Sequence, residues 1–219
     1  MKYTDTRNFD HGRKPRIGVL ITNLGTPQAP QTKQLRRYLK EFLWDPRVVE
    51  VPRLVWWFVL NVIILNIRPK RSAKAYAKVW SSEGSPLLVH TKAQAEALQA
   101  SLLAQYGDDV VVDFAMRYGE PSIANRIQGL MDRGVTRLLV LPLYPQYSGT
   151  TTAAVFDAVM KKLGQLRWIP ETRFINNYHD DPAFIDALAL SIREHWAHRP
   201  RGEKLLMSFH GIPKSLLEK

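Results

Sequence analysis

The sequence contains no cysteine among its 219 residues. Disulfide bridges, thiolate metal sites, cysteine nucleophiles and thiol redox switches are therefore excluded within this chain. There is no low-complexity tract, and the apolar fraction of 45% is ordinary, so we expect a folded core rather than disorder. Residues 1–12 are polar and lack the apolar stretch of a signal peptide, which fits a cytosolic protein.

No apolar run is long enough to span a membrane. The longest, residues 56–67, contains two asparagines and is 12 residues long, whereas a spanning helix needs about 20. Arg53 precedes it, and Arg68, Lys70 and Arg71 follow. Aromatic and aliphatic residues between cations favour a segment that lies on anionic headgroups, or the lip of a pocket for a flat ligand with carboxylates. A buried helix with a solvated basic end is equally consistent with the pattern.

Acidic residues are scarce in the first third of the chain. Residues 1–71 contain 14 Lys/Arg and 5 Asp/Glu, whereas the other 148 residues contain 17 and 15. The net charge of +11 is therefore concentrated around the apolar run. A nucleic-acid-binding protein would carry its cations along a reading element, and no such motif is present. The charge pattern instead favours one surface that meets an anionic partner.

Strand-like apolar runs alternate with helical patterns along most of the chain. The expected strands are residues 17–23, 110–116, 137–143, 171–176 and 204–209. The expected helices are residues 31–43, 86–106, 122–133, 150–163 and 182–198, with one short helix before Lys219. This order predicts an α/β fold with a mostly parallel sheet covered by helices on both faces. Ligands of such sheets bind at the carboxyl ends of the strands.

Two loops at expected strand ends carry candidate binding residues. Arg117 could hold a carboxylate bidentately, and Tyr118 adds stacking area and a donor. A surface arginine and a half-buried tyrosine are nevertheless the commoner explanation of such a pair. Residues 144–152 lead two tyrosines into a hydroxyl-rich helix start, which favours an anion. Ser148 or Thr150 as a helix N-cap is compatible with that role.

The expected strand at residues 204–209 would deliver His210 to the carboxyl edge of the sheet, where Gly211 and Pro213 shape the turn. A histidine there can ligate a metal or accept a proton near neutral pH. A lone histidine is more often structural. No HExxH motif or cluster of His and Asp residues completes a metal site in the sequence.

Seven short segments, distributed almost from one end of the chain to the other, together carry a family resemblance. They are residues 18–27, 38–43, 84–86, 116–121, 141–148, 178–182 and 208–213. Together they resemble the ferrochelatase family, the enzymes that insert ferrous iron into protoporphyrin IX to make haem. The run Leu-Pro-Leu-Tyr-Pro-Gln-Tyr-Ser at residues 141–148 is especially specific.

The resemblance implies two Rossmann-like, chelatase-type domains with parallel sheets flanked by helices, the second domain incomplete, and a porphyrin cleft between them. We therefore expect a first domain at residues 1–147, including an apolar lip at residues 48–71, and a partial second domain at residues 148–219. The family chain continues past Lys219 with a glutamate that faces the histidine. The sequence is accordingly expected to be a fragment with impaired activity and poor solubility.

The resemblance also implies site residues. His210 matches the catalytic histidine, which is assigned either as iron ligand or as acceptor of pyrrole protons. The implied substrate-binding residues are Leu24, Ser85, Arg117, Tyr118, Tyr147 and Ser148. Leu24 stands where relatives that use coproporphyrin tend to carry tyrosine, which favours protoporphyrin.

Further expectations concern cofactors and partners. The resemblance implies no required cofactor in this chain, with Fe²⁺ and protoporphyrin IX as substrates and haem as product, and it leaves an iron–sulfur cluster beyond these residues open. It implies a cytoplasmic protein in peripheral contact with the inner membrane through residues 53–71, and no nucleic acid partner. A non-catalytic porphyrin- or haem-binding module and a cobalt or nickel tetrapyrrole chelatase remain alternatives.

Overall fold

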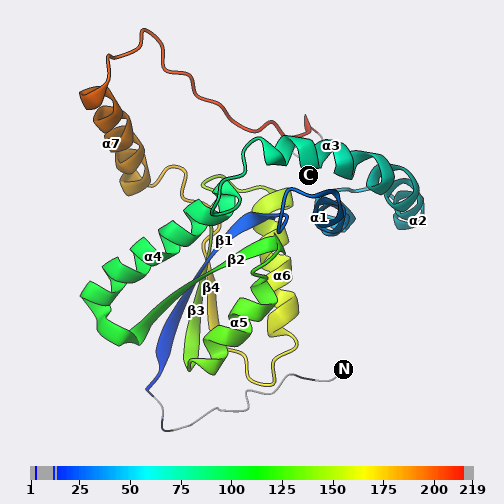
Figure 1. Cartoon of the computed structure of the whole chain (residues 1–219). Coiled ribbons are helices and arrows are strands. Elements are labelled where there is room, and N and C mark those ends of the chain that lie inside the picture. Colours follow the sequence, from blue (N-terminus) through cyan, green and yellow to red (C-terminus); the bar gives the residue numbers. More distant parts are fainter. Residues whose placement is uncertain (1–2, 4–11, 13, 215–219) are drawn as a thin grey trace. The chain divides into compact units, whose positions relative to one another are not determined.

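The computed structural model describes residues 3, 12 and 14–214 and forms two compact units, Met1–Asn176 and Asn177–Lys219. The first unit contains a four-stranded sheet in which all neighbouring strands are parallel (Figure 1). In spatial order the strands are β2 (Val110–Gly119), β1 (Arg16–Thr26), β3 (Val135–Pro142) and β4 (Glu171–Phe174). The predicted α/β class is confirmed. The part of the chain that the structure describes contains this sheet and no second one.

Helices cover both faces of the sheet, as expected from the alternating pattern (Figure 1). Helix α4 (Pro86–Tyr106) covers one face, where Val19 and Ile21 of β1 are buried. Helices α5 (Ile123–Asp132) and α6 (Ala154–Leu163) cover the other, where Leu20 of β1 is buried. Neighbouring side chains of a strand point to opposite faces, so a strand that is apolar throughout requires this double cover.

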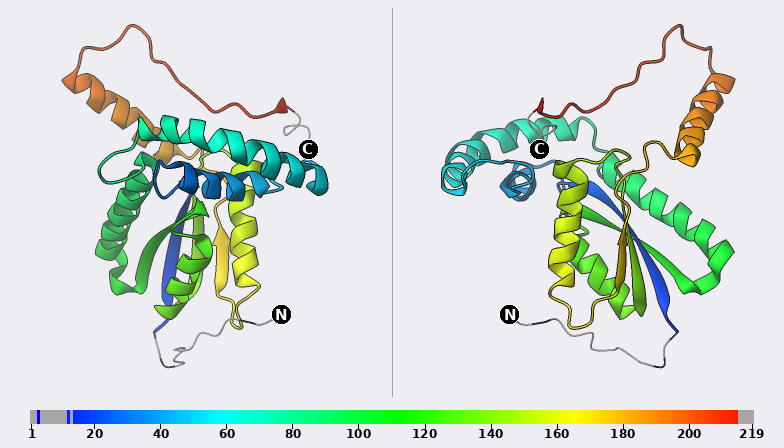
Figure 2. Two further views of the ribbon diagram at one scale, coloured as in Figure 1. Left: turned by 45° about the vertical axis from the view of Figure 1, so that its right-hand side comes forward. Right: turned by 180° about the vertical axis from the view of Figure 1, so that it is seen from behind.

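A further helical layer lies across the carboxyl ends of the strands (Figure 2). It consists of α1 (Thr32–Trp44), α2 (Arg53–Phe58), the π-helical turn η1 (Val59–Ile64) and α3 (Leu65–Ala77). Its buried residues Tyr38, Leu39, Leu43, Leu60 and Leu65 form one cluster with Tyr118 of β2. Within the described residues no helix is both long and apolar enough to cross a bilayer.

The apolar lip, residues 48–71, has one buried side and one exposed side. Leu60 and Leu65 are buried against α1, whereas Leu54 is 88% exposed and Ile67 is 69% exposed. The alternative of a buried helix with a solvated basic end does not describe this segment, because many of its apolar side chains are exposed. The segment therefore presents apolar side chains to solvent beside exposed cations.

A proline in the lip leaves one backbone carbonyl without its helical donor, and this carbonyl binds the lip to α1. Pro69 lies inside α3 and has no N–H to offer the carbonyl of Leu65 one turn earlier. That carbonyl instead accepts a hydrogen bond from Arg36 Nη1 of α1 at 2.5 Å, and Asn66 Oδ1 accepts from the same nitrogen at 2.8 Å. The guanidinium thus binds α1 to the junction between η1 and α3.

The backbone N–H groups on the outer edge of β2 already donate hydrogen bonds within the chain. The side chain of Gln99 donates to the carbonyl of Val110 at 3.2 Å and accepts from the N–H of Val112 at 2.6 Å. The N–H of Phe114 donates to the Asp113 carboxylate at 2.9 Å. The N–H of Met116 donates to the carbonyl of Pro121 at 2.7 Å. Because alternate residues point their N–H groups to the same side, these three donors lie on the outer edge.

The predicted boundary between residues 147 and 148 falls in the loop after β3. The turn η3 (Gly149–Ala153), α6 and β4 follow this point in the chain, and β4 pairs with β3 in parallel register. In the structure, the two compact units meet at Asn176 and Asn177.

The second unit contains helix α7 (Pro182–His198), which confirms the expected helix. Asp181 caps it by accepting from the N–H of Ala183 at 2.9 Å. The expected strand at residues 204–209 is wrong, because this segment is irregular. A strand requires a neighbour with which to exchange backbone hydrogen bonds, and residues 177–214 provide none. The short helix before Lys219 falls on residues 215–219, outside the described residues.

Candidate active site

The carboxyl ends of β1 and β2 bring Leu24 and Tyr118 into one cluster beneath the lip. Tyr118 is fully buried, and its ring meets that of Phe42 edge to face, with centroids 5.1 Å apart. Its hydroxyl donates to Asp45 Oδ2 at 2.8 Å. Burial raises the pKa of Tyr118 well above its usual range, so the phenol stays protonated and keeps donating to the carboxylate.

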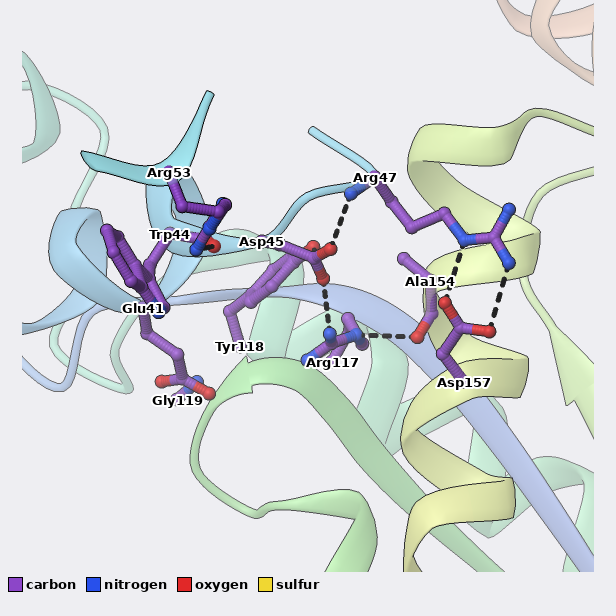
Figure 3. A network of polar contacts seen from close by, with 10 residues as sticks. All are labelled: Glu41, Trp44, Asp45, Arg47, Arg53, Arg117, Tyr118, Gly119, Ala154 and Asp157. Atoms are coloured by element: carbon purple, nitrogen blue, oxygen red, sulfur yellow. Dashed lines mark hydrogen bonds and ion pairs between the residues drawn. The ribbon is translucent and has the colours of Figure 1, made fainter. Parts of the chain in front are cut away.

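Arg117 is held on two sides (Figure 3). Its Nε donates to the carbonyl of Ala154 at 2.7 Å, its Nη2 donates to Asp45 Oδ2, and its Cζ lies 4.4 Å from the centre of the Tyr118 ring. The side chain remains 17% exposed. It lines a hollow of about 380 Å³ with Asp157 and Lys161. A guanidinium with donors to spare can bind a carboxylate.

Ser148 begins the turn η3 after β3. Its hydroxyl accepts from the N–H of Thr150 at 3.3 Å, which confirms the N-cap expectation for Ser148. Tyr147, the preceding residue, is 51% exposed. Since η3 leads directly to Ala154, whose carbonyl accepts from Arg117, the loop after β3 and the end of β2 are held together.

Ser85 lies at the N-cap position of α4 and is buried. Its carbonyl accepts from the N–H of Val89 at 3.0 Å, and its side chain makes no capping bond. It lines a hollow of about 380 Å³ together with Trp80 and Glu120, which is a different hollow from that of Arg117. The structure thus groups Leu24, Arg117 and Tyr118 and places Ser85 beside another cavity.

His210 belongs to the second unit, where it lies in the irregular segment after α7 and is exposed. Over residues 14–214 no group of three or more His, Cys, Asp or Glu side chains is arranged to hold a metal ion. The catalytic role of His210 stays a prediction that rests on its motif.

The sequence patterns missed the carboxylate at the centre of this site. Asp45 is the C-cap residue of α1, and its side chain is 5% exposed. Beside it, Arg47 makes a bidentate ion pair with Asp157 of α6, with Nε and Nη2 at 2.7 and 3.1 Å from the two carboxylate oxygens (Figure 3). In the sequence, Asp45 stands between an apolar helix end and Pro46. This pattern indicates where the helix ends but does not indicate a role in a site.

Comparisons with known proteins show the family of this chain. A family model described as ferrochelatase matches residues 16–219. The chain belongs to the ferrochelatase family. The ferrochelatase of Pseudoalteromonas atlantica is 58% identical over 217 residues, which cover 99% of this chain and 60% of that protein. Those of Idiomarina loihiensis and Marinobacter nauticus are 56% and 54% identical, covering all of this chain and 60% and 59% of their own lengths.

Membership in the ferrochelatase family confirms the resemblance carried by the seven segments, and the match extends over both compact units. The chain spans about 60% of the length of the curated ferrochelatases that it matches.

Proposed function

We propose that this protein takes part in inserting ferrous iron into protoporphyrin IX to form haem. Its ferrochelatase match over residues 16–219 carries the proposal, since that range includes every candidate site residue. Iron enters the reaction as a substrate rather than as a resident cofactor. The chemistry requires two pyrrole N–H protons to leave the porphyrin and the iron to lose its water.

We assign His210 to the reacting centre, either as acceptor of the pyrrole protons or as an iron ligand. A neutral imidazole is suited to both tasks near neutral pH. Leu24 would lie against the porphyrin face, Arg117 would bind a propionate, and Tyr118 would support the guanidinium from below. Ser85, Tyr147 and Ser148 complete the proposed cleft lining.

The test is an anaerobic assay of the 219-residue chain with protoporphyrin IX and Fe²⁺. Porphyrin fluorescence reports binding, and haem absorbance reports insertion. Insertion by this chain is expected to be slow, in line with the impaired activity predicted from its sequence, and His210→Ala should lower it further by about 100-fold or more while leaving porphyrin affinity unchanged. His195→Ala, which removes an exposed histidine of α7, is the matched control and should have no effect.

Each other result of this assay points to a specific alternative. Porphyrin binding without insertion, unaffected by His210→Ala, would favour a non-catalytic porphyrin- or haem-binding module. Insertion of Co²⁺ or Ni²⁺ in preference to Fe²⁺ would favour a different tetrapyrrole chelatase. Absence of porphyrin binding would contradict the proposal.

We further propose that the lip makes peripheral contact with a membrane through residues 53–71. Leu54, Trp57 and Phe58 are each more than half exposed on its outer side, and the exposed cations Arg68 and Lys70 lie further along the same helical segment. Such a face inserts shallowly into anionic lipid, where a porphyrin of low solubility would also partition.

Vesicle sedimentation tests this contact. The protein should bind phosphatidylglycerol vesicles more tightly than phosphatidylcholine vesicles, and Leu54→Asp should weaken binding about tenfold or more because it places a charge on the inserted face. Leu103→Asp, at an exposed leucine of α4, is the matched control. Equal binding by both variants would contradict a role for the lip.

A further inference from the structure

Asp45 is a buried carboxylate whose two oxygens are both engaged. Oδ1 accepts from the backbone N–H of Arg47 at 2.8 Å. Oδ2 accepts from the Tyr118 hydroxyl at 2.8 Å and from Arg117 Nη2. A charge taken out of water is costly unless it is paired and hydrogen-bonded, so a carboxylate in this position requires a compensating partner.

That partner is Arg117, whose guanidinium is oriented by two hydrogen bonds and one aromatic ring. The bonds from Nη2 to Asp45 and from Nε to the Ala154 carbonyl fix the guanidinium within its plane. The Tyr118 ring at 4.4 Å supports the group from one side. In residues 14–214 the Nη1 nitrogen has no hydrogen-bond partner, so its two N–H groups remain free to donate.

Asp45 is itself held by the parts of the fold that meet around it. Its backbone carbonyl accepts from the N–H groups of Val48 and Val49, both at 3.0 Å, which orders the loop after α1. Arg47, two residues on, is paired bidentately with Asp157 of α6. The carboxylate therefore connects the end of α1, the end of β2 and the start of α6 (Figure 3).

We propose that Asp45 is a positioning residue for substrate binding: it holds the Arg117 guanidinium so that the Nη1 edge meets a carboxylate of the porphyrin. This inference rests on the proposed function for the class of substrate. Asp45 does not touch the substrate. Its effect passes through Arg117, and Tyr118 contributes by sharing the Asp45 carboxylate and by stacking under the guanidinium.

The experiment compares protoporphyrin IX with its dimethyl ester, which keeps the ring and removes both carboxylates. Asp45→Asn should lower affinity for the diacid about tenfold and leave affinity for the ester unchanged. Tyr118→Phe, which keeps the stacked ring and the Asp45–Arg117 pair, should cause a smaller loss of the same kind. An equal loss for both ligands would overturn the proposal, because a merely structural role predicts it.

A double-mutant cycle adds a second criterion. The Arg117→Lys substitution removes the planar guanidinium that Asp45 would hold. If Asp45 acts through Arg117, the double variant Asp45→Asn/Arg117→Lys should have the same ratio of diacid to ester affinity as Arg117→Lys alone. An additive effect of the two substitutions would overturn the role of Asp45 through Arg117.

A ligand-free readout separates this inference from the proposed function. In the unmodified chain the Arg117 Nε–H should exchange slowly in ¹⁵N NMR spectra, and Asp45→Asn should speed both its exchange and rotation about the Nε–Cζ bond. Unchanged dynamics would overturn positioning by Asp45. Failure of the unmodified chain to bind either porphyrin would instead contradict the proposed function, whatever the spectra show.

Discussion

The two compact units of this chain have similar local patterns and different interiors. In Met1–Asn176 the strands and helices enclose buried residues on both faces of a sheet. In the second unit, α7 forms its full predicted length, yet over residues 177–214 no side chain is buried and residues 204–209 remain irregular. A helix satisfies its own backbone, whereas a strand depends on neighbours, so the same kind of sequence pattern has different outcomes in the two units.

The largest expected effect contrasts two leucines. Leu20 on β1 is fully buried in the first unit, whereas Leu190 on α7 is about half exposed. Leu20→Ala should lower the free energy of unfolding by about 2–5 kcal/mol because it leaves a cavity, and Leu190→Ala should change it by less than about 1 kcal/mol. Urea titrations followed by circular dichroism measure both values, and similar losses would remove the contrast between the units.

A pair of helix caps tests the same contrast at a smaller scale. Asp181 caps α7, and Ser122 caps α5 by accepting from the N–H of Asn125 at 3.4 Å. Replacing either residue with alanine should cost about 1 kcal/mol. Amide hydrogen exchange should quicken along α7 in Asp181→Ala, whereas α5 should keep its protection in Ser122→Ala because Ile127 is buried in the core. Equal fraying of the two helices would contradict this account.

The smallest effect concerns a buried lysine of the first unit. Lys162 is buried and donates to Gln128 Oε1 at 2.8 Å, and burial lowers its pKa in the folded state. Burial of the charged ammonium group therefore lowers the free energy of unfolding. This cost is fully present below the lowered pKa of the folded state and disappears as pH rises from that pKa to the unfolded value of about 10.4. Lys162→Met should gain up to about 1 kcal/mol near pH 7 relative to the parent.

The gain from Lys162→Met should shrink as pH rises toward 10. Thermal unfolding between pH 7 and 10 measures it, and Lys204→Met, at an exposed position of the second unit, is the control. A gain that does not vary with pH would show that packing rather than charge burial causes it.

Sequence patterns predicted most of the fold, because helix and strand periodicities report local preferences. They located α4 and α7 to the residue and the four strands to within a few residues. They failed at residues 204–209, where composition favours a strand and the necessary neighbour is not among the described residues. In the site, motifs named Arg117 and Tyr118. Asp45 was missed because its role depends on contacts with residues more than seventy positions away.

The occupied edge of β2 determines where the sheet can be enlarged. The outward N–H groups of Val112, Phe114 and Met116 already donate to Gln99, Asp113 and Pro121, so an additional strand would have to displace all three partners. On the opposite side, no strand within residues 14–214 pairs with the outer edge of β4. The outer edge of β4 is therefore the edge at which a further strand could pair without displacing these three hydrogen bonds.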